Sequence, residues 1–143
     1  MYHRILFAVM SAALVVSAAS ASQNDSSKVT IPVNKTDATS GQQMYVNYCA
    51  PCHGIDAKGH GPVAPVLKVP PTDLTLLSSK NNGKFPDAHI VTVLQNGANM
   101  PAHGTAQMPV WGPIFGKMNV SNPQEKQLRM SNLSRYLETL QVK

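Results

Sequence analysis

Apolar residues along this chain gather in a few short stretches, separated by long stretches rich in glycine, proline and polar residues. The first stretch covers residues 5–16; Arg4 precedes it and small residues follow at 19–21. A positive start, a short apolar run and small residues are typical of a secretory signal peptide, so we expect residues 1–21 to be removed on export. No later run is long enough to span a membrane, so we expect no transmembrane anchor after cleavage. An uncleaved N-terminal anchor is the alternative.

The next segment, residues 22–40, is rich in Ser, Asn, Asp, Thr and Lys. It has too little apolar surface to offset the entropy lost on ordering, so we expect a flexible leader. Helical spacing of apolar residues begins after it, at Met44, Tyr45 and Tyr48. Either Thr39 or Ser40 can cap a helix that starts near Gly41.

Glycine and proline punctuate two long segments. Seven of these residues lie between positions 54 and 77, which excludes a long helix or a central strand there. We expect a folded loop with one helical turn at residues 73–77. A second loop is expected over residues 96–115, which contain two Met-Pro pairs.

Two further helices are expected. Residues 89–95 contain strand formers, but Asp87 and Gly97 flank them as helix caps, and we favour a helix. The clearest helix runs from about residue 123 to 140, because Asn122, Pro123 and Glu125 match an N-cap, a first-turn proline and a capping box. Its apolar stripe consists of Leu128, Leu133, Tyr136, Leu137 and Leu140.

The length and the charge of the chain limit the number of domains and the kinds of partner that we expect. Cleavage after Ala21 leaves 122 of the 143 residues, enough for one domain, which we place at residues 41–143. Only 13% of the residues are charged, the net charge is +5, and the lysines are dispersed. Because no basic run could follow a phosphate backbone, we expect no nucleic-acid partner. An ordinary solvated surface explains the lysines better than a cationic docking face does.

Residues 49–53 read Cys-Ala-Pro-Cys-His, the signature of covalent c-type haem attachment. Two thiols at this spacing, Cys49 and Cys52, can each add to one vinyl group of a haem. His53 follows at once, which brings a neutral imidazole nitrogen under the ring as an axial ligand of iron. The sequence therefore predicts one covalently bound haem c.

Other uses of the two cysteines are less consistent with the sequence. A disulfide would need the same two sulfur atoms. A thioredoxin-like dithiol would need a strand before the motif, whereas residues 42–48 have a helical pattern. Zinc would need two more well-spaced ligands, and His53 directly beside Cys52 is poorly placed to complete a tetrahedral site.

The chain resembles the class I cytochromes c, in their small monohaem exported bacterial form. The matching pieces, in order, are Gly41-x-x-x-Tyr45, Cys49-Ala50-Pro51-Cys52-His53-Gly54, Asp56-Ala57-Lys58-Gly59-His60-Gly61-Pro62, Asn96-Gly97 before a Met-Pro loop, and Tyr136 in a final helix. The resemblance implies an all-α fold in which the first and last helices cross, Gly41 approaches Tyr136, and loops wrap around the haem. It also implies a methionine as sixth ligand and a proline carbonyl bonded to the imidazole, a role that Pro62 fits best.

Five methionines remain after cleavage, and methionine is commonly a flexible core residue. Met44 lies in the helix that carries the motif and Met130 in the last helix, so neither easily reaches the far face of a haem. The remaining candidates are Met100, Met108 and Met118. We favour Met108, which precedes proline and begins a Met-Pro-x-Trp-Gly stretch that resembles the distal-ligand segment of related cytochromes; Met100 is the alternative.

Several other side chains near these motifs have two interpretations. Trp111 could close the haem edge and donate to a propionate, or it could be an ordinary core aromatic residue. Each of three histidines could serve as a distal ligand, but surface or core positions are commoner for this residue: His60, His89 and His103.

A saturated His/Met ligand pair leaves no open position for a substrate, so we predict an electron carrier in the periplasm and not an enzyme. Its partners would be redox proteins, such as a membrane oxidase or a quinol-oxidising complex, met as a monomer through a small contact. The alternatives are a five-coordinate haem enzyme, a gas-binding sensor, or the haem-bearing subunit of a periplasmic dehydrogenase.

Overall fold

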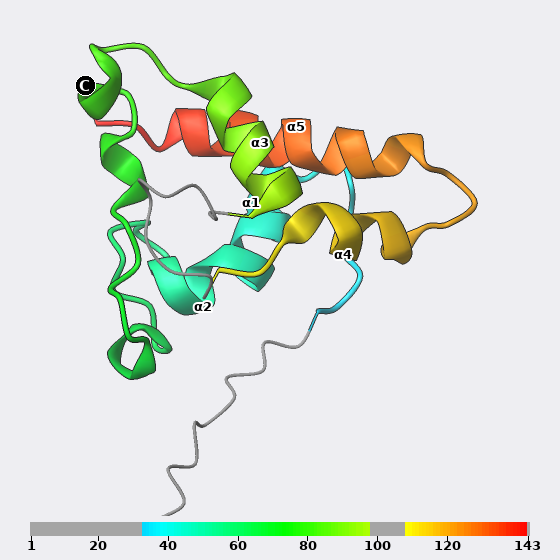
Figure 1. The fold of residues 1–143 in the computed structure, drawn as a ribbon, viewed down its shortest axis with the longest axis horizontal. Coiled ribbons are helices and arrows are strands. Elements are labelled where there is room, and N and C mark those ends of the chain that lie inside the picture. Colours follow the sequence, from blue (N-terminus) through cyan, green and yellow to red (C-terminus); the bar gives the residue numbers. More distant parts are fainter. Residues whose placement is uncertain (1–32, 98–107, 143) are drawn as a thin grey trace, which may run out of the picture.

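The computed structural model describes residues 33–97 and 108–142, and within these ranges the chain forms helices and loops with no strand. The helices are α1 (Gly41–Met44), η1 (Tyr45–Cys49), α2 (Ala50–His53), η2 (Ala64–Val66), η3 (Leu74–Leu76), η4 (Ser79–Asn81), α3 (Asp87–Asn96), α4 (Trp111–Met118) and α5 (Gln124–Thr139). Figure 1 shows their arrangement. The predicted all-α class is confirmed. The expected signal peptide lies outside the described residues.

The first helical stretch is continuous from α1 through η1 to α2. Ser40 begins it as predicted, because its Oγ accepts a hydrogen bond from the amide of Gln43 at 3.1 Å. The middle segment η1 is a π-helix, a widened turn that is rare in proteins and frequent at functional sites. It ends at Cys49, so the wide turn leads directly into the Cys-x-x-Cys-His motif.

This stretch packs against α5, the last helix. A Cβ added to Gly41 would lie 2.7 Å from Cβ of Tyr136, so only glycine allows the two backbones to come this close. The Tyr45 and Tyr136 rings meet beside this point with centroids 5.5 Å apart. The expected close approach of Gly41 to Tyr136 is confirmed. The buried core around it consists chiefly of Met44, Tyr45, Tyr48, Trp111, Phe115, Met130, Leu133 and Leu137.

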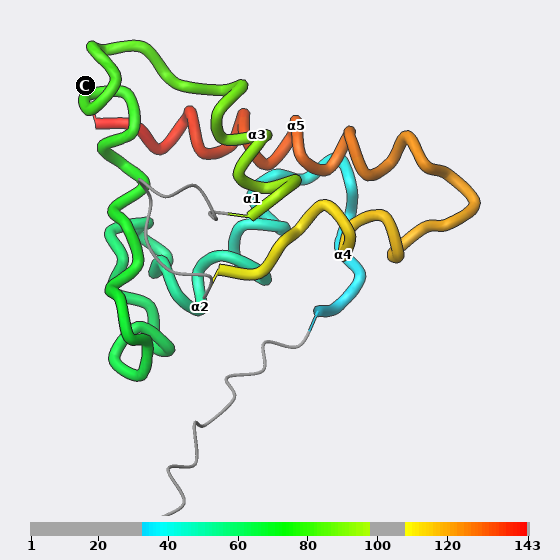
Figure 2. The backbone as a smooth tube through the Cα atoms, in the orientation of Figure 1, coloured from blue at the N-terminus to red at the C-terminus, as the bar shows by residue number. Residues whose placement is uncertain are grey.

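The chain between α2 and α3 runs as a long loop along one side of the helices (Figure 2). Its short helical turn η3 matches the turn predicted at residues 73–77. Asp73 caps this turn by accepting hydrogen bonds from both the amide and the hydroxyl of Thr75, at 2.8 and 2.7 Å. The far end of the chain is fastened to the same turn, because the amide of Val142 donates to the carbonyl of Thr75 at 3.0 Å.

Three local features of the structure differ from the predictions. The second loop, expected over residues 96–115, gives way to α4 at Trp111. Part of the predicted flexible leader is packed: Thr36 is buried and its carbonyl accepts a hydrogen bond from Arg129 at 2.7 Å. At the start of α5 no capping box forms, because the Glu125 carboxylate bonds instead to Arg129.

At the start of α3, Asp87 was also predicted as a cap. The structure makes it the first residue of the helix, and its carboxylate accepts a hydrogen bond from the hydroxyl of Ser134 on α5 at 2.6 Å. Among the described residues, no helix combines the length and the apolar character needed to cross a bilayer.

Candidate functional site

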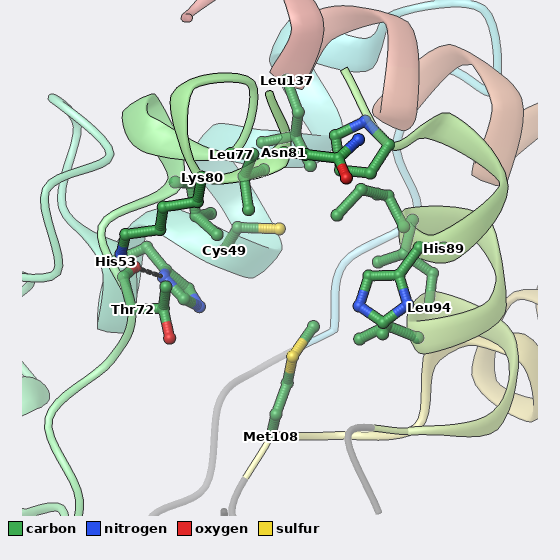
Figure 3. Close-up of a pocket in the computed structure, with 14 residues that line it drawn as sticks. Cys49, His53, Thr72, Leu77, Lys80, Asn81, His89, Leu94, Met108 and Leu137 are labelled. Atoms are coloured by element: carbon green, nitrogen blue, oxygen red, sulfur yellow. Dashed lines mark hydrogen bonds between the residues drawn. The ribbon is translucent and has the colours of Figure 1, made fainter. Parts of the chain in front are cut away.

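A cavity of about 520 Å³ opens between α2, α3 and the loop that precedes α3. Its wall is mainly apolar, formed by Leu74, Leu77, Pro86, Ile90, Val93, Leu94, Met108 and Leu137. The remaining lining residues carry polar or sulfur-containing groups, namely Cys49, His53, Thr72, Lys80, Asn81 and His89. Figure 3 shows Cys49, His53, Met108 and His89 reaching the cavity from different sides. The size and the apolar wall with a few polar groups are typical of a cofactor site.

Of the two cysteines of the motif, buried Cys49 lines this cavity, and half-buried Cys52 lies one turn further along the chain. The sulfur of Cys49 points into the cavity (Figure 3). Burial raises the pKa of Cys49 to about 12 and also raises the pKa of Cys52. A redox-active dithiol needs the opposite, a lowered thiol pKa. The described residues also contain no strand before the motif, so both observations argue against the thioredoxin-like alternative.

His53 is held in one orientation. Its Nδ1 lies 2.9 Å from the carbonyl oxygen of Thr72, which can only accept, so Nδ1 carries the proton. The lone pair is therefore on Nε2, the nitrogen that is left for a metal. Burial lowers the pKa of His53, which favours the neutral imidazole that a metal requires, and the hydrogen bond to Thr72 opposes this only in part.

The carbonyl in this hydrogen bond was predicted to be that of Pro62, and that prediction is wrong. The Pro62 loop packs under the backbone of the motif and not beside the imidazole. The amide of Gly61 donates to Cys52 O at 3.0 Å and that of Val63 to Pro51 O at 2.9 Å. A Cβ on Gly61 would lie 2.6 Å from Ala50 O, so the two backbones are in direct contact. No sequence signal singles out Thr72, because every residue has a carbonyl.

Met108 is half-buried and lines the cavity, with its side chain directed inward in Figure 3. The segment after it is pressed against the end of α3: a Cβ on Gly97 would lie 2.9 Å from Cγ2 of Val110. Met44 and Met130 are fully buried in the core, as expected. Met118 packs against the buried core and does not line the cavity. Its sulfur lies 3.9 Å from the Tyr48 hydroxyl. Met100 lies outside the described residues.

Trp111 is a core residue. It is 2% exposed, and its ring stacks on Tyr48 and on Phe115 with centroids 5.2 and 5.6 Å apart. It does not appear in the cavity wall. The predicted role at a haem edge is therefore not the one that the structure gives it, and the core interpretation is confirmed.

The three histidines fall in different places. His89 lines the cavity, whereas His60 is exposed on the Gly-Pro loop and is not part of the cavity wall. His103 lies outside the described residues. The sequence prediction missed the cavity-facing residues of α3, although Ile90, Val93 and Leu94 have the spacing of one helical face.

The residues present fit a haem. The motif brings a thiol and a metal-binding nitrogen to one cavity, and the rest of the wall offers mainly hydrocarbon to a large flat ring. A methionine sulfur is available at the same cavity. These are the donors expected for thioether attachment and for axial ligation by an imidazole and a thioether.

In the comparison with protein families, the model described as cytochrome c oxidase, cbb3-type, subunit III matches residues 36–118, more than half of the chain. The match begins at the buried Thr36, inside the segment predicted as leader. Comparison with curated proteins and with solved structures found no match.

Proposed function

Since the chain belongs to this family of cbb3-type cytochrome c domains, and is thus a class I c-type cytochrome, we propose that it is an exported electron carrier with a single haem. The domain implies haem c and electron transfer. The single haem, its ligands, the export and the shuttling between partners are our proposals.

Each residue of the site has a distinct task in this proposal. Cys49 and Cys52 hold the ring covalently, so the cofactor cannot dissociate. His53 would hold the iron through Nε2, and Thr72 fixes the tautomer of His53 and the plane of its ring. Met108 would supply a thioether sulfur as the second protein donor to the iron. Bound haem supplies a reversible one-electron iron couple, which a thioether ligand biases toward the ferrous state.

The observation that carries the proposal is the convergence of Cys49, His53 and Met108 on one mainly apolar cavity. A mainly apolar wall would exclude water from the bound cofactor, and a low local dielectric and solvent exclusion are among the factors that set a haem's reduction potential. With His53 and Met108 both holding the iron, no position would remain for a substrate, and electrons would cross during brief docking with a partner.

The carrier interpretation is tested by the absorption spectra of the oxidised and reduced protein. We expect a thioether-to-ferric charge-transfer band in the wild type, its loss in Met108→Ala and its retention in Met100→Ala. Ferrous wild-type protein that binds carbon monoxide readily at neutral pH would favour a five-coordinate enzyme or gas sensor instead. Loss of the band in Met100→Ala alone would assign the distal ligand to Met100.

If the chain is exported, the proposed export decides both the compartment in which it acts and the partners that it can meet there. We propose a periplasmic location after removal of residues 1–21, with donor and acceptor redox proteins met by a monomer. The family description names an oxidase subunit, which makes a membrane oxidase one partner class to test. A role as the haem subunit of a periplasmic dehydrogenase would instead give a stable complex that survives purification.

A further inference from the structure

We propose that His89 is a second distal ligand, able to bind the iron in place of the methionine sulfur. This inference rests on the haem site proposed above. A second protein donor to a bound iron would have to reach the cavity from another side than His53 does. Figure 3 shows the imidazoles of His53 and His89 on opposite sides of the cavity, and both residues line it.

The helix that carries His89 holds it in place. The residue lies in the first turn of α3 and is half-buried, and Ile90 and Leu94 beside it are buried in the core. The start of this helix is tied to α5 by the hydrogen bond from Ser134 to Asp87. The imidazole is therefore presented to the cavity by a packed helix.

Met108 and His89 lie on two segments of the chain that pack against each other. The chain that follows Met108 packs on the end of α3, where a Cβ on Gly112 would lie 2.5 Å from the carbonyl oxygen of Gln95. A donor from α3 and a donor from the segment before α4 thus face the same cavity, while His53 faces it from α2. The cavity has one proximal donor and two distal candidates.

The exchange is chemically balanced. An imidazole nitrogen of His89 would replace the sulfur of Met108 as donor to the iron; both donors are neutral, and no electron would be gained or lost. Because thioether ligation favours ferrous iron, the imidazole competes best in the ferric state. We therefore expect methionine ligation to dominate in the intact reduced protein and His89 to take over when the thioether is lost.

The test uses the full chain matured with haem, with both Met-Pro methionines replaced. Met100→Ala/Met108→Ala removes every thioether that the sequence offers in a loop before proline. We expect this parent variant to stay low-spin and six-coordinate, without the thioether charge-transfer band, and to bind carbon monoxide slowly. Adding His89→Ala, or His89→Gln to keep a polar side chain, should give high-spin iron that binds carbon monoxide readily.

The matched control adds His60→Ala to the same parent, since His60 is exposed and away from the cavity wall. It should leave the low-spin spectrum intact. A parent variant that is already high-spin would overturn the inference, as would a low-spin spectrum that survives both changes at His89. These outcomes differ from failure of the haem proposal, in which the wild-type mass would contain no haem.

Discussion

The buried guanidinium of Arg129 gives the sharpest prediction at the scale of single residues. It is 1% exposed and donates to Thr36 O at 2.7 Å, to Thr36 Oγ1 at 3.0 Å and to Glu125 at 2.6 Å. Arg129→Ala leaves the buried Thr36 carbonyl and the half-buried Glu125 carboxylate without their partner, so we expect a loss of about 3 kcal/mol in the free energy of unfolding. Urea unfolding of the haem-loaded protein measures it.

Arg135→Ala is the matched control, because it removes an exposed arginine from the same helix. It should change the stability by less than about 0.5 kcal/mol. Equal losses in the two variants would mean that the Arg129 contacts do not fasten residues 33–40 to the domain.

Asp73 gives a pH-dependent prediction. Hydrogen bonds from Thr75 lower the pKa of Asp73 below its ordinary value of 3.8, against a smaller opposing effect of burial. A carboxyl with a lowered folded-state pKa stabilises the fold above the unfolded pKa and loses that contribution as the pH falls through the folded value. Asp73→Ala should therefore cost about 1 kcal/mol near neutral pH and much less in strong acid.

The readout for Asp73 is the free energy of unfolding of wild type and variant across the acid range. Asp73→Asn keeps an acceptor oxygen for Thr75 without the charge, so its stability should depend less on pH than that of the wild type. A difference between wild type and Asp73→Ala that is the same at every pH would contradict the assignment.

At the residue scale, the sequence predicted the side chains that would hold the haem, but it did not predict the backbone group that orients His53. Cys49, His53 and Met108 carry chemistry in their side chains, which a sequence displays directly. The carbonyl of Thr72 is a backbone group, and only the path of the loop decides that it meets the imidazole in place of Pro62. The stacking of Trp111 on Tyr48 likewise depends on how α4 packs.

At the scale of elements, the crossing of α1 and α5 depends on Gly41. Gly41→Ala should destabilise the protein by about 2 kcal/mol, because the new Cβ would overlap the backbone of Asn132 and Cβ of Tyr136. Thermal unfolding of the haem-loaded protein measures the loss. The overlap outweighs the smaller gain in helix propensity that alanine brings.

Gly116→Ala in α4 is the control for Gly41→Ala. There the added Cβ would make an ordinary contact of 3.6 Å with Lys126, so the substitution should leave stability unchanged or raise it slightly. A stable Gly41→Ala protein would show that the two helices need not come so close.

The helix over residues 41–53 was predicted because apolar spacing and the Ser40 cap agree, and α5 was predicted from its apolar stripe although its capping box does not form. The start of α4 was missed because Gly112 and Pro113 suggest a loop. Proline is tolerated in the first turn of a helix, where its missing N–H has no intrahelical partner. Gly112 has a packing role that no local pattern displays, since it lets α4 meet Gln95 of α3.

At the scale of the whole molecule, the proposed export predicts where the mature chain begins. We expect protein recovered from the periplasm of an expressing host to start at Ser22, which N-terminal sequencing of the purified material checks. A chain that keeps Met1 and stays with the membrane fraction would support an uncleaved anchor. The packed domain starts before the predicted boundary at Gly41, because buried Thr36 joins it to α5.

The central claim is that a haem is joined covalently to Cys49 and Cys52 in the cavity beside His53. The intact mass of the purified protein, from a host that matures c-type cytochromes, tests it most directly. We predict the mass of the polypeptide plus one haem, retained after denaturation and lost in the Cys49→Ala/Cys52→Ala variant. A wild-type mass equal to that of the polypeptide alone would contradict the account.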